Sequence, residues 1–193
     1  MNDEPLKKDQ TFVSFDKNEG NKYRWMAVTA LLLAIGAILH FVVPSVGGIS
    51  PNFMISMYVI AINLTRPTLL ESAGIGLVAG IINIPTSKSA FPFANIPSEL
   101  AGALCCAVTI HLFAGMHLSR FKLLPGLSAG LSTLVSGLIF TGILKFVLVL
   151  PWNVYFYGML PVVAIVALLN VVITQVLYYP AEKLFHRQEN EEE

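Results

Sequence analysis

Six long apolar runs, separated by proline, glycine and charged residues, limit what this chain can fold into more than any other feature. A helix needs about 20 mostly apolar residues to cross the hydrocarbon core of a bilayer. Backbone polar groups in lipid must be satisfied within the protein, and a helix does this within a single run. The sequence therefore predicts an all-α polytopic membrane protein, a bundle of six transmembrane helices. The runs are 25–43, 52–65, 69–84, 98–118, 125–150 and 155–179.

The composition agrees with lipid as the main solvent of the surface. Charged residues make up 12% of the 193 residues, whereas a soluble domain carries roughly 25%. The second and third runs are short for a full span, so tilting of the helices or local thinning of the bilayer is expected there. Arg66-Pro67 ends the second run, because proline disfavours helical geometry in the residue before it. Ser98 is the expected N-cap of the fourth helix.

The distribution of lysine and arginine predicts the orientation. We expect a polar N-terminal segment (1–24), a transmembrane domain (25–179) and an acidic tail (180–193) that is solvated and partly disordered. With the N-terminus inside, ten basic residues lie in the cytoplasm and only Lys88 lies in an outer loop, as the positive-inside rule requires. This predicts a multi-pass cell-membrane protein with both termini cytoplasmic. The ten residues are Lys7, Lys8, Lys17, Lys22, Arg24, Arg66, Arg120, Lys122, Lys183 and Arg187.

No motif for catalysis, a cofactor or nucleic-acid binding stands out. The phosphate-binding loop G-x-x-x-x-G-K-[ST] is missing, and Cys105 and Cys106 are adjacent, without the spaced partners of a metal site. Residues 126–130 fit the serine-hydrolase motif G-x-S-x-G, but Ser128 falls one turn inside a predicted helix, and the last helix has no histidine base. A small-residue packing face is the favoured interpretation. We expect a protein that is not an enzyme and holds neither cofactor nor metal.

Two ionisable residues at membrane depth are candidates for solute binding, because charges are costly in lipid. Glu99 begins the fourth helix, and Lys145 lies near the outer end of the fifth, at the same level. Three interpretations are open: Lys145 reaches the outer interface, the two residues pair, or they bind the ammonium and carboxylate of a zwitterion. Amide and aromatic groups nearby suit a small, mostly apolar ligand with a polar end. The predicted substrate-binding residues are Asn52, Asn95, Glu99, Lys145 and Trp152.

Small residues spaced by four mark faces where membrane helices approach closely. Gly76 with Gly80, and the glycines of 126–130, favour packing within the monomer over contact with a partner. Ala30 and Ala34 differ, because further alanines at positions 27 and 37 extend the same flank of the first helix. This alanine-lined flank suits docking of a partner membrane protein.

Three stretches of the chain resemble a known family. AVTALLLAIGAILH, GGISPNFMISMYVIAINLTRP and SAFPFANIPSE are similar to the substrate-binding (S) components of energy-coupling factor transporters, most of all to the tryptophan-transport protein family. The resemblance implies a six-helix protein that binds a micronutrient outside the cell and works with a transmembrane coupling subunit and two cytoplasmic ATPase subunits. It also implies that Ala30 and Ala34 contact the coupling subunit, and that loops 44–51, 85–97 and 151–155 form the pocket.

We therefore predict the substrate-specificity subunit of an ATP-driven micronutrient uptake transporter, binding tryptophan or a related aromatic compound on the extracellular side. The missing phosphate loop fits this prediction, because the ATPases are separate chains. A self-sufficient secondary transporter or channel is the main alternative. It predicts internal repeats, and the first and last three runs show no convincing self-similarity. An assembly subunit without a ligand is a further alternative.

Overall fold

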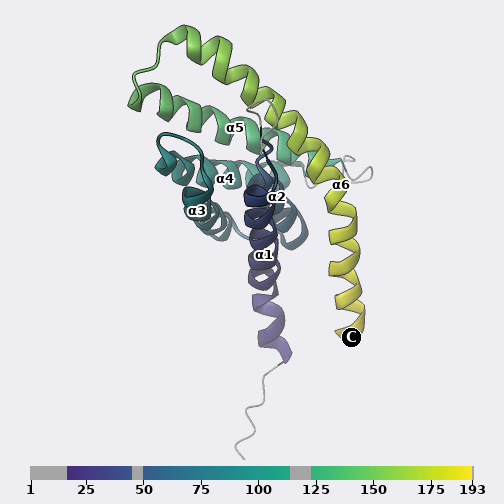
Figure 1. The fold of residues 1–193 in the computed structure, drawn as a ribbon. Helices are drawn as coiled ribbons and strands as arrows, with labels where there is room; N and C mark the ends of the chain where they lie inside the picture. The colour runs from purple at the N-terminus through teal and green to yellow at the C-terminus, as the bar shows by residue number, and fades with distance from the viewer. Residues whose placement is uncertain (1–16, 45–49, 114–122, 193) are drawn as a thin grey trace, which may run out of the picture.

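The computed structural model describes residues 17–44, 50–113 and 123–192, and every regular element in these ranges is helical (Figure 1). This confirms the predicted all-α class. Residues 1–16, the loop 45–49, the predicted helix end 114–118 and the basic link with Arg120 and Lys122 lie outside the described residues. The elements are α1 (Lys17–Val42), α2 (Phe53–Thr65), α3 (Leu69–Thr86), η1 (Pro92–Ala94), α4 (Asn95–Phe113), α5 (Leu124–Val147), η3 (Val154–Met159) and α6 (Leu160–Glu192).

Five of the helices are long and apolar enough to cross a membrane, and α2 is the shorter exception. The five candidate spans are Trp25–Val42, Leu69–Thr86, Pro92–Phe113, Leu124–Val147 and Val154–Phe185. Together with the shorter α2 they form the predicted polytopic bundle. The start of α1 and the end of α6 lie on the same side of the molecule, at the bottom of Figure 1.

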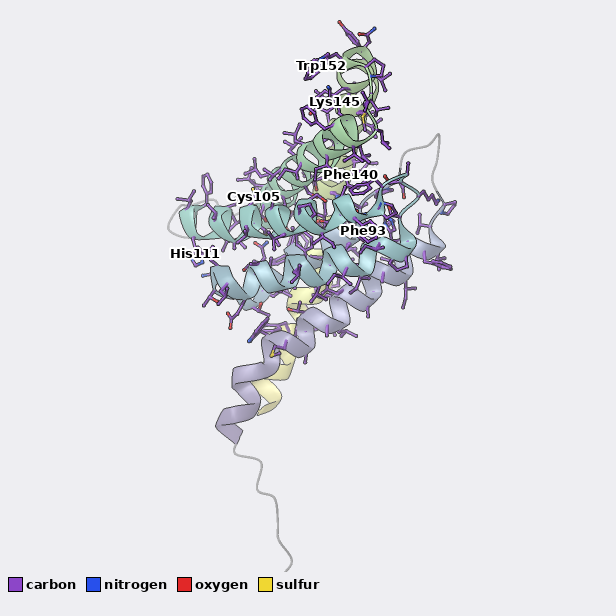
Figure 2. All side chains as sticks on the ribbon, turned by 90° about the vertical axis from the view of Figure 1, so that its left-hand side faces the viewer. Phe93, Cys105, His111, Phe140, Lys145 and Trp152 are labelled. Carbon is purple, nitrogen blue, oxygen red and sulfur yellow. The ribbon has the colours of Figure 1, made fainter. Side chains whose placement is uncertain are left out.

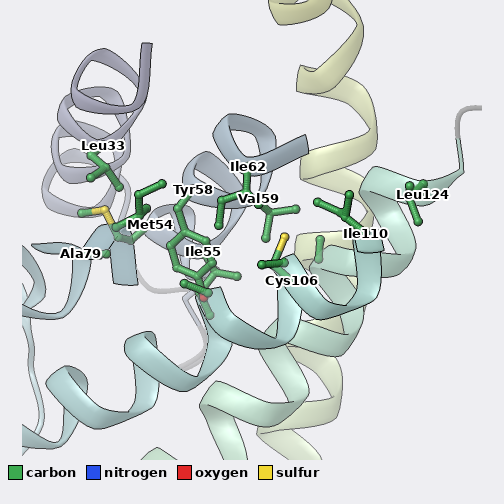
Figure 3. Close-up of a cluster of buried hydrophobic side chains, with 14 residues drawn as sticks. Leu33, Met54, Ile55, Tyr58, Val59, Ile62, Ala79, Cys106, Ile110 and Leu124 are labelled. Carbon is green, nitrogen blue, oxygen red and sulfur yellow. The ribbon is translucent and has the colours of Figure 1, made fainter. Parts of the chain in front are cut away.

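The short helix α2 forms the centre of the bundle. Its 13 residues include an unbroken buried stretch from Phe53 to Asn63, and it packs against α1, α3, α4, α5 and α6. A helix that is apolar on all sides is expected in such a position. Met54, Tyr58 and Val59 of α2 meet side chains of the neighbouring helices in the main hydrophobic cluster (Figure 3). The short second run therefore belongs to a protein-covered helix.

Two helix boundaries follow from local chemistry. Arg66 adopts a left-handed conformation (φ 46°) immediately after α2, so the predicted stop at Arg66-Pro67 is confirmed. Thr68 then caps α3: its Oγ1 accepts from the backbone N–H of Glu71 at 3.3 Å, while the Glu71 carboxylate accepts from the Thr68 backbone N–H at 2.7 Å. This reciprocal capping box satisfies two backbone donors at once.

Other boundaries differ from those predicted. The helix α4 begins at Asn95 after the 3-10 turn η1, so Ser98 is not its N-cap; the Ser98 hydroxyl instead donates to the Asn95 carbonyl at 3.1 Å inside the helix. Likewise, α6 continues through Pro180 to Glu192. The tail predicted to be partly disordered is helical over this range. Polar residues such as glutamate, glutamine, lysine and arginine have good helix propensity, so the helix can extend beyond its buried part.

Glycine brings neighbouring helices into close contact. A Cβ atom on Gly76 would lie 2.7 Å from the backbone oxygen of Glu99, and one on Gly80 would lie 2.7 Å from the Cα atom of Ile96. Both distances are too short for a side chain, so α3 packs directly on the backbone of α4. Gly126 likewise lies close to α6. Its backbone N–H donates a hydrogen bond to Gln175 Oε1 of α6 at 3.2 Å. These contacts confirm packing within the monomer.

Candidate functional site

A cavity of about 450 Å³ lies among the ends of several helices. It is lined by the end of α1, the start of α2, the end of α3, the start of α4, the second half of α5 and the first part of α6 with η3. Since α1 contributes its end and α6 its first part, the cavity lies away from the start of α1 and from the end of α6. Its volume is within the range of small-molecule sites.

The cavity has one polar and one apolar wall. Polar side chains come from the segment before α2 and from α3, α4 and α5, whereas α5, η3 and α6 contribute hydrocarbon and aromatic groups. A site with this division can hold a molecule that is polar at one end and apolar at the other. The main polar residues are Asn52, Asn83, Asn95, Ser98, Glu99 and Ser136, and the main apolar residues are Phe140, Met159, Val162, Val163 and Val166.

Glu99 is the centre of the polar wall. Its side chain is 1% exposed, and its Oε1 accepts hydrogen bonds from Asn52 Nδ2 at 2.7 Å and Asn83 Nδ2 at 2.9 Å. The other oxygen, Oε2, accepts longer bonds from the hydroxyls of Tyr58 at 3.2 Å and Ser136 at 3.5 Å. All four donors in the described part of the chain are neutral. A buried carboxylate without a cationic partner is costly, so this position favours a ligand that brings a positive charge.

Two buried polar atoms, in residues that line the cavity, have no hydrogen-bond partner within the described structure. One is the Oδ1 of Asn83, a residue that is 3% exposed, and the other is Nδ1 of His40. Buried polar groups are hydrogen-bonded in the great majority of cases. Both atoms are buried rather than open to the cavity, so they would meet a ligand only after the two side chains turn toward it.

The structure brings three of the five predicted substrate-binding residues to this cavity. Asn52, Asn95 and Glu99 line it. Asn95 also donates from its Nδ2 to the Pro92 carbonyl at 2.7 Å, which joins the start of α4 to η1. The reason these residues meet is topological, because the beginnings of α2 and α4 lie at the same end of the bundle.

The other two predicted residues, Lys145 and Trp152, do not line the cavity. They lie toward the tip of the hairpin formed by α5 and α6, beyond Phe140 (Figure 2). The Lys145 ammonium is 3.8 Å from the centre of the Trp152 ring, a cation–π contact. The pairing of Glu99 with Lys145, one of the three open interpretations, does not form in this structure, because α5 extends past the level of the cavity before it reaches Lys145.

Several residues of the site were missed in the sequence. Tyr58 reads as one more apolar residue of α2, and Ser136 as one small residue of α5. Ser128, Ser132 and Ser136 are spaced by four, and this spacing places them on one helix face. A polar stripe on an otherwise apolar helix was the signal that pointed toward the interior.

Ser128, the serine of the G-x-S-x-G match, is fully buried at the opposite end of this stripe. Its hydroxyl accepts from Asn63 Nδ2 at 3.0 Å and donates to the Pro125 carbonyl at 3.0 Å. The bond from Asn63 joins α2 to the start of α5, and the bond to Pro125 lies within α5. The geometry agrees with the interpretation of the motif as a packing feature.

The alanine-lined flank of α1 is open in the structure. Ala27, Ala30 and Ala34 are exposed, while Ala37 is half-buried and packs against the hydrophobic cluster. Exposed Leu31 and Ile38 lie on the same helix. The flank thus presents small side chains between larger apolar ones, on a surface that no other described helix covers.

Comparison with known proteins identifies relatives over most of the chain. A family model described as "Tryptophan transporter TrpP" matches residues 22–186. A probable tryptophan transport protein of Clostridium perfringens is 34% identical over 182 residues, covering 88% of this chain and 97% of that protein. One from Bacillus subtilis is 29% identical over 160 residues, covering 82% and 90% respectively. No solved structure matches the chain.

Proposed function

Since the chain belongs to the tryptophan transporter family, we propose that it binds tryptophan in the cavity around Glu99 and delivers it across the membrane. Membership confirms the resemblance to the tryptophan-transport proteins drawn from the sequence. The chain is a multi-pass membrane protein of this family. The cavity, the ligand contacts and the coupling described below are parts of the proposal.

The observation that carries the proposal is a carboxylate buried beside an apolar wall. Glu99 has four neutral hydrogen-bond donors and is 1% exposed. The ammonium group of an amino acid would supply the missing positive charge. Phe140, Met159 and the valines of α6 offer the indole ring an apolar surface, and aromatic rings gain from such contact.

Uptake is the direction of transport in this proposal, and the position of the cavity and the distribution of basic residues support it. The cavity lies at the end of α1 and the first part of α6, away from the start of α1 and the end of α6. Ten basic residues are on the terminal side by the sequence assignment, with Lys88 alone on the other. The positive-inside rule then puts both termini in the cytoplasm and the cavity outside. The chain thereby acts in uptake.

The energy for uptake comes from partner chains in this proposal. The chain contains no phosphate-binding loop. Its resemblance to S components implies that a transmembrane coupling subunit and two cytoplasmic ATPases work with it. The exposed Ala30 and Ala34 are the contact for the coupling subunit. Small side chains support this role, because they let a partner helix approach α1 closely. The chain itself binds and reorients, without covalent chemistry.

Ligand binding to the purified full chain in detergent tests the proposal, by calorimetry with L-tryptophan. We expect tryptophan to bind the wild type and Glu99→Gln to weaken binding by about 10-fold to 100-fold, because a hydrogen bond to a charged group contributes roughly 1.5–3 kcal/mol. Glu71→Gln is the matched control, since Glu71 lies in the capping box of α3. Failure of tryptophan to bind the wild type, or equal binding by both variants, overturns the proposed site.

A further inference from the structure

Two glycines on one face of α5 bring α6 directly against the backbone of α5. A Cβ atom on Gly130 would lie 3.0 Å from Cγ2 of Val171, and one on Gly137 would lie 2.6 Å from Cγ1 of Val163. A valine side chain has few rotamers, so it cannot easily turn away from such an atom. The two valines therefore occupy the space that a side chain on α5 would need.

The contact between Gly137 and Val163 lies at the cavity. Both residues line it, whereas Gly130 and Val171 do not. Val163 is 7% exposed, so most of its side chain is covered by protein. It thus forms part of the apolar wall while it packs on the α5 backbone.

The same point of α5 is tied to the polar wall. Ser136 donates to Oε2 of Glu99 at 3.5 Å, and Gly137 follows it directly in the chain. The Gly137 carbonyl accepts from Thr141 Oγ1 at 2.7 Å, within the same helix. Consecutive residues of α5 therefore contact the carboxylate of one wall and Val163 of the other. The separation of the two walls is set through the backbone of α5.

We propose that Val163, positioned by Gly137, limits the cavity on the side of α6 and thereby determines the size of ring that is accepted there. This inference rests on the proposed function, since it names the residues that limit the apolar end of the same ligand. Val163 is then a specificity-determining residue, and Gly137 is a positioning residue that acts through it. A hydrophobic pocket discriminates a single methylene by about 10-fold to 200-fold.

Tryptophans that carry one methyl group at different positions of the indole ring test the role of Val163. Calorimetry on the full chain in detergent compares each of them with L-tryptophan. In Val163→Ala, the affinity of at least one methyl compound relative to tryptophan should rise by about 10-fold, because the ring substituent can fill the space left by the valine. Val163→Ile should shift the ratio in the opposite direction. Val171→Ala is the matched control, since Val171 packs on a glycine of α5 away from the cavity.

A compensating pair of substitutions tests the role of Gly137. Gly137→Ala alone should lower the melting temperature and the affinity for tryptophan, because the new Cβ atom displaces Val163. When Gly137→Ala is combined with Val163→Ala, that Cβ atom occupies the space of the lost Cγ atoms. Both the melting temperature and the methyl preference should then return toward the wild type. Gly142→Ala is the control on the same helix, because a Cβ atom there meets nothing within 4 Å.

The outcomes separate this inference from the proposed function. An unchanged methyl preference in Val163→Ala and Val163→Ile, or an equal change in Val171→Ala, overturns the size limit and leaves tryptophan binding intact. A double variant that melts like the wild type but keeps the preference of Val163→Ala shows that Gly137 serves packing alone. The Val163 comparison decides the matter even if Gly137→Ala does not fold. Absence of tryptophan binding to the wild type overturns the proposed function itself.

Discussion

Asn52 illustrates how one side chain can serve the fold and the site together. Its Oδ1 accepts from the Ile55 backbone N–H at 3.3 Å and caps α2, while its Nδ2 donates to Glu99 at 2.7 Å. Its backbone carbonyl accepts from Asn170 Nδ2 of α6 at 3.2 Å. An amide is needed here, because a single side chain must offer both an acceptor and a donor.

Asn52→Asp separates these roles. The aspartate keeps an acceptor for the cap but puts a second carboxylate in the place of the donor to Glu99. We expect a stability loss of roughly 1.5–3 kcal/mol, the contribution of a hydrogen bond to a charged group, seen as a lower melting temperature in detergent. Asn153→Asp, at an exposed position of the hairpin tip, is the control. Equal melting of the two variants would show that the Asn52–Glu99 bond contributes nothing.

At the scale of the elements, the glycines of α3 decide how close α4 can come. The Cβ clash at Gly80 is with backbone atoms, 2.7 Å from Ile96 Cα and 2.8 Å from the Asn95 oxygen. Backbone atoms cannot rotate away as a side chain can. Since Asn83 of α3 and Glu99 of α4 must meet to form the polar wall, the spacing of these helices also sets the geometry of the cavity.

Gly80→Ala should therefore destabilise the protein and weaken ligand binding together. Overpacking of this kind costs typically about 1–3 kcal/mol. Gly74→Ala is the matched control, because a Cβ atom at Gly74 meets nothing within 4 Å and alanine is a better helix former than glycine. Thermal unfolding in detergent measures both variants. A melting temperature for Gly80→Ala at or above that of Gly74→Ala would contradict close packing of α3 on α4.

The helices could be predicted from the sequence because apolar length and proline breaks are local signals, as in the stop of α2 at Arg66. The start of α4 could not, because the turn η1 continues into it without a break. For the cavity, the helix phase indicated which residues face inward, but not how far along a helix the cavity reaches. Thr141 lines it and Lys145, one turn later, does not.

For the molecule as a whole, the cavity and the alanine-lined flank of α1 lie on different surfaces. In the proposed function, binding and coupling therefore use separate surfaces. A change on one surface should leave the other intact, and this separation makes the proposed coupling testable.

Ala30→Trp and Ala34→Trp should block ATP-driven tryptophan uptake in cells that express the coupling module, because a bulky ring prevents close approach of a partner helix. Tryptophan binding to the purified variants should be unchanged. Gly74→Trp, at an exposed position of α3 with open space around it, is the control. Normal uptake by both alanine variants would contradict the role of α1, and uptake by the purified chain in liposomes without ATP would favour a self-sufficient transporter.

The enclosure of α2 has a consequence for how the protein is made. At 13 residues, α2 falls short of the roughly 20 that let a helix enter a bilayer independently. Its final surroundings include α6, which is translated after it, and Asn170 Nδ2 of α6 donates to the Asn52 carbonyl at the start of α2. The protein surroundings of α2 are therefore complete only after α6 has been translated, so the middle of the bundle gains its last cover late in synthesis.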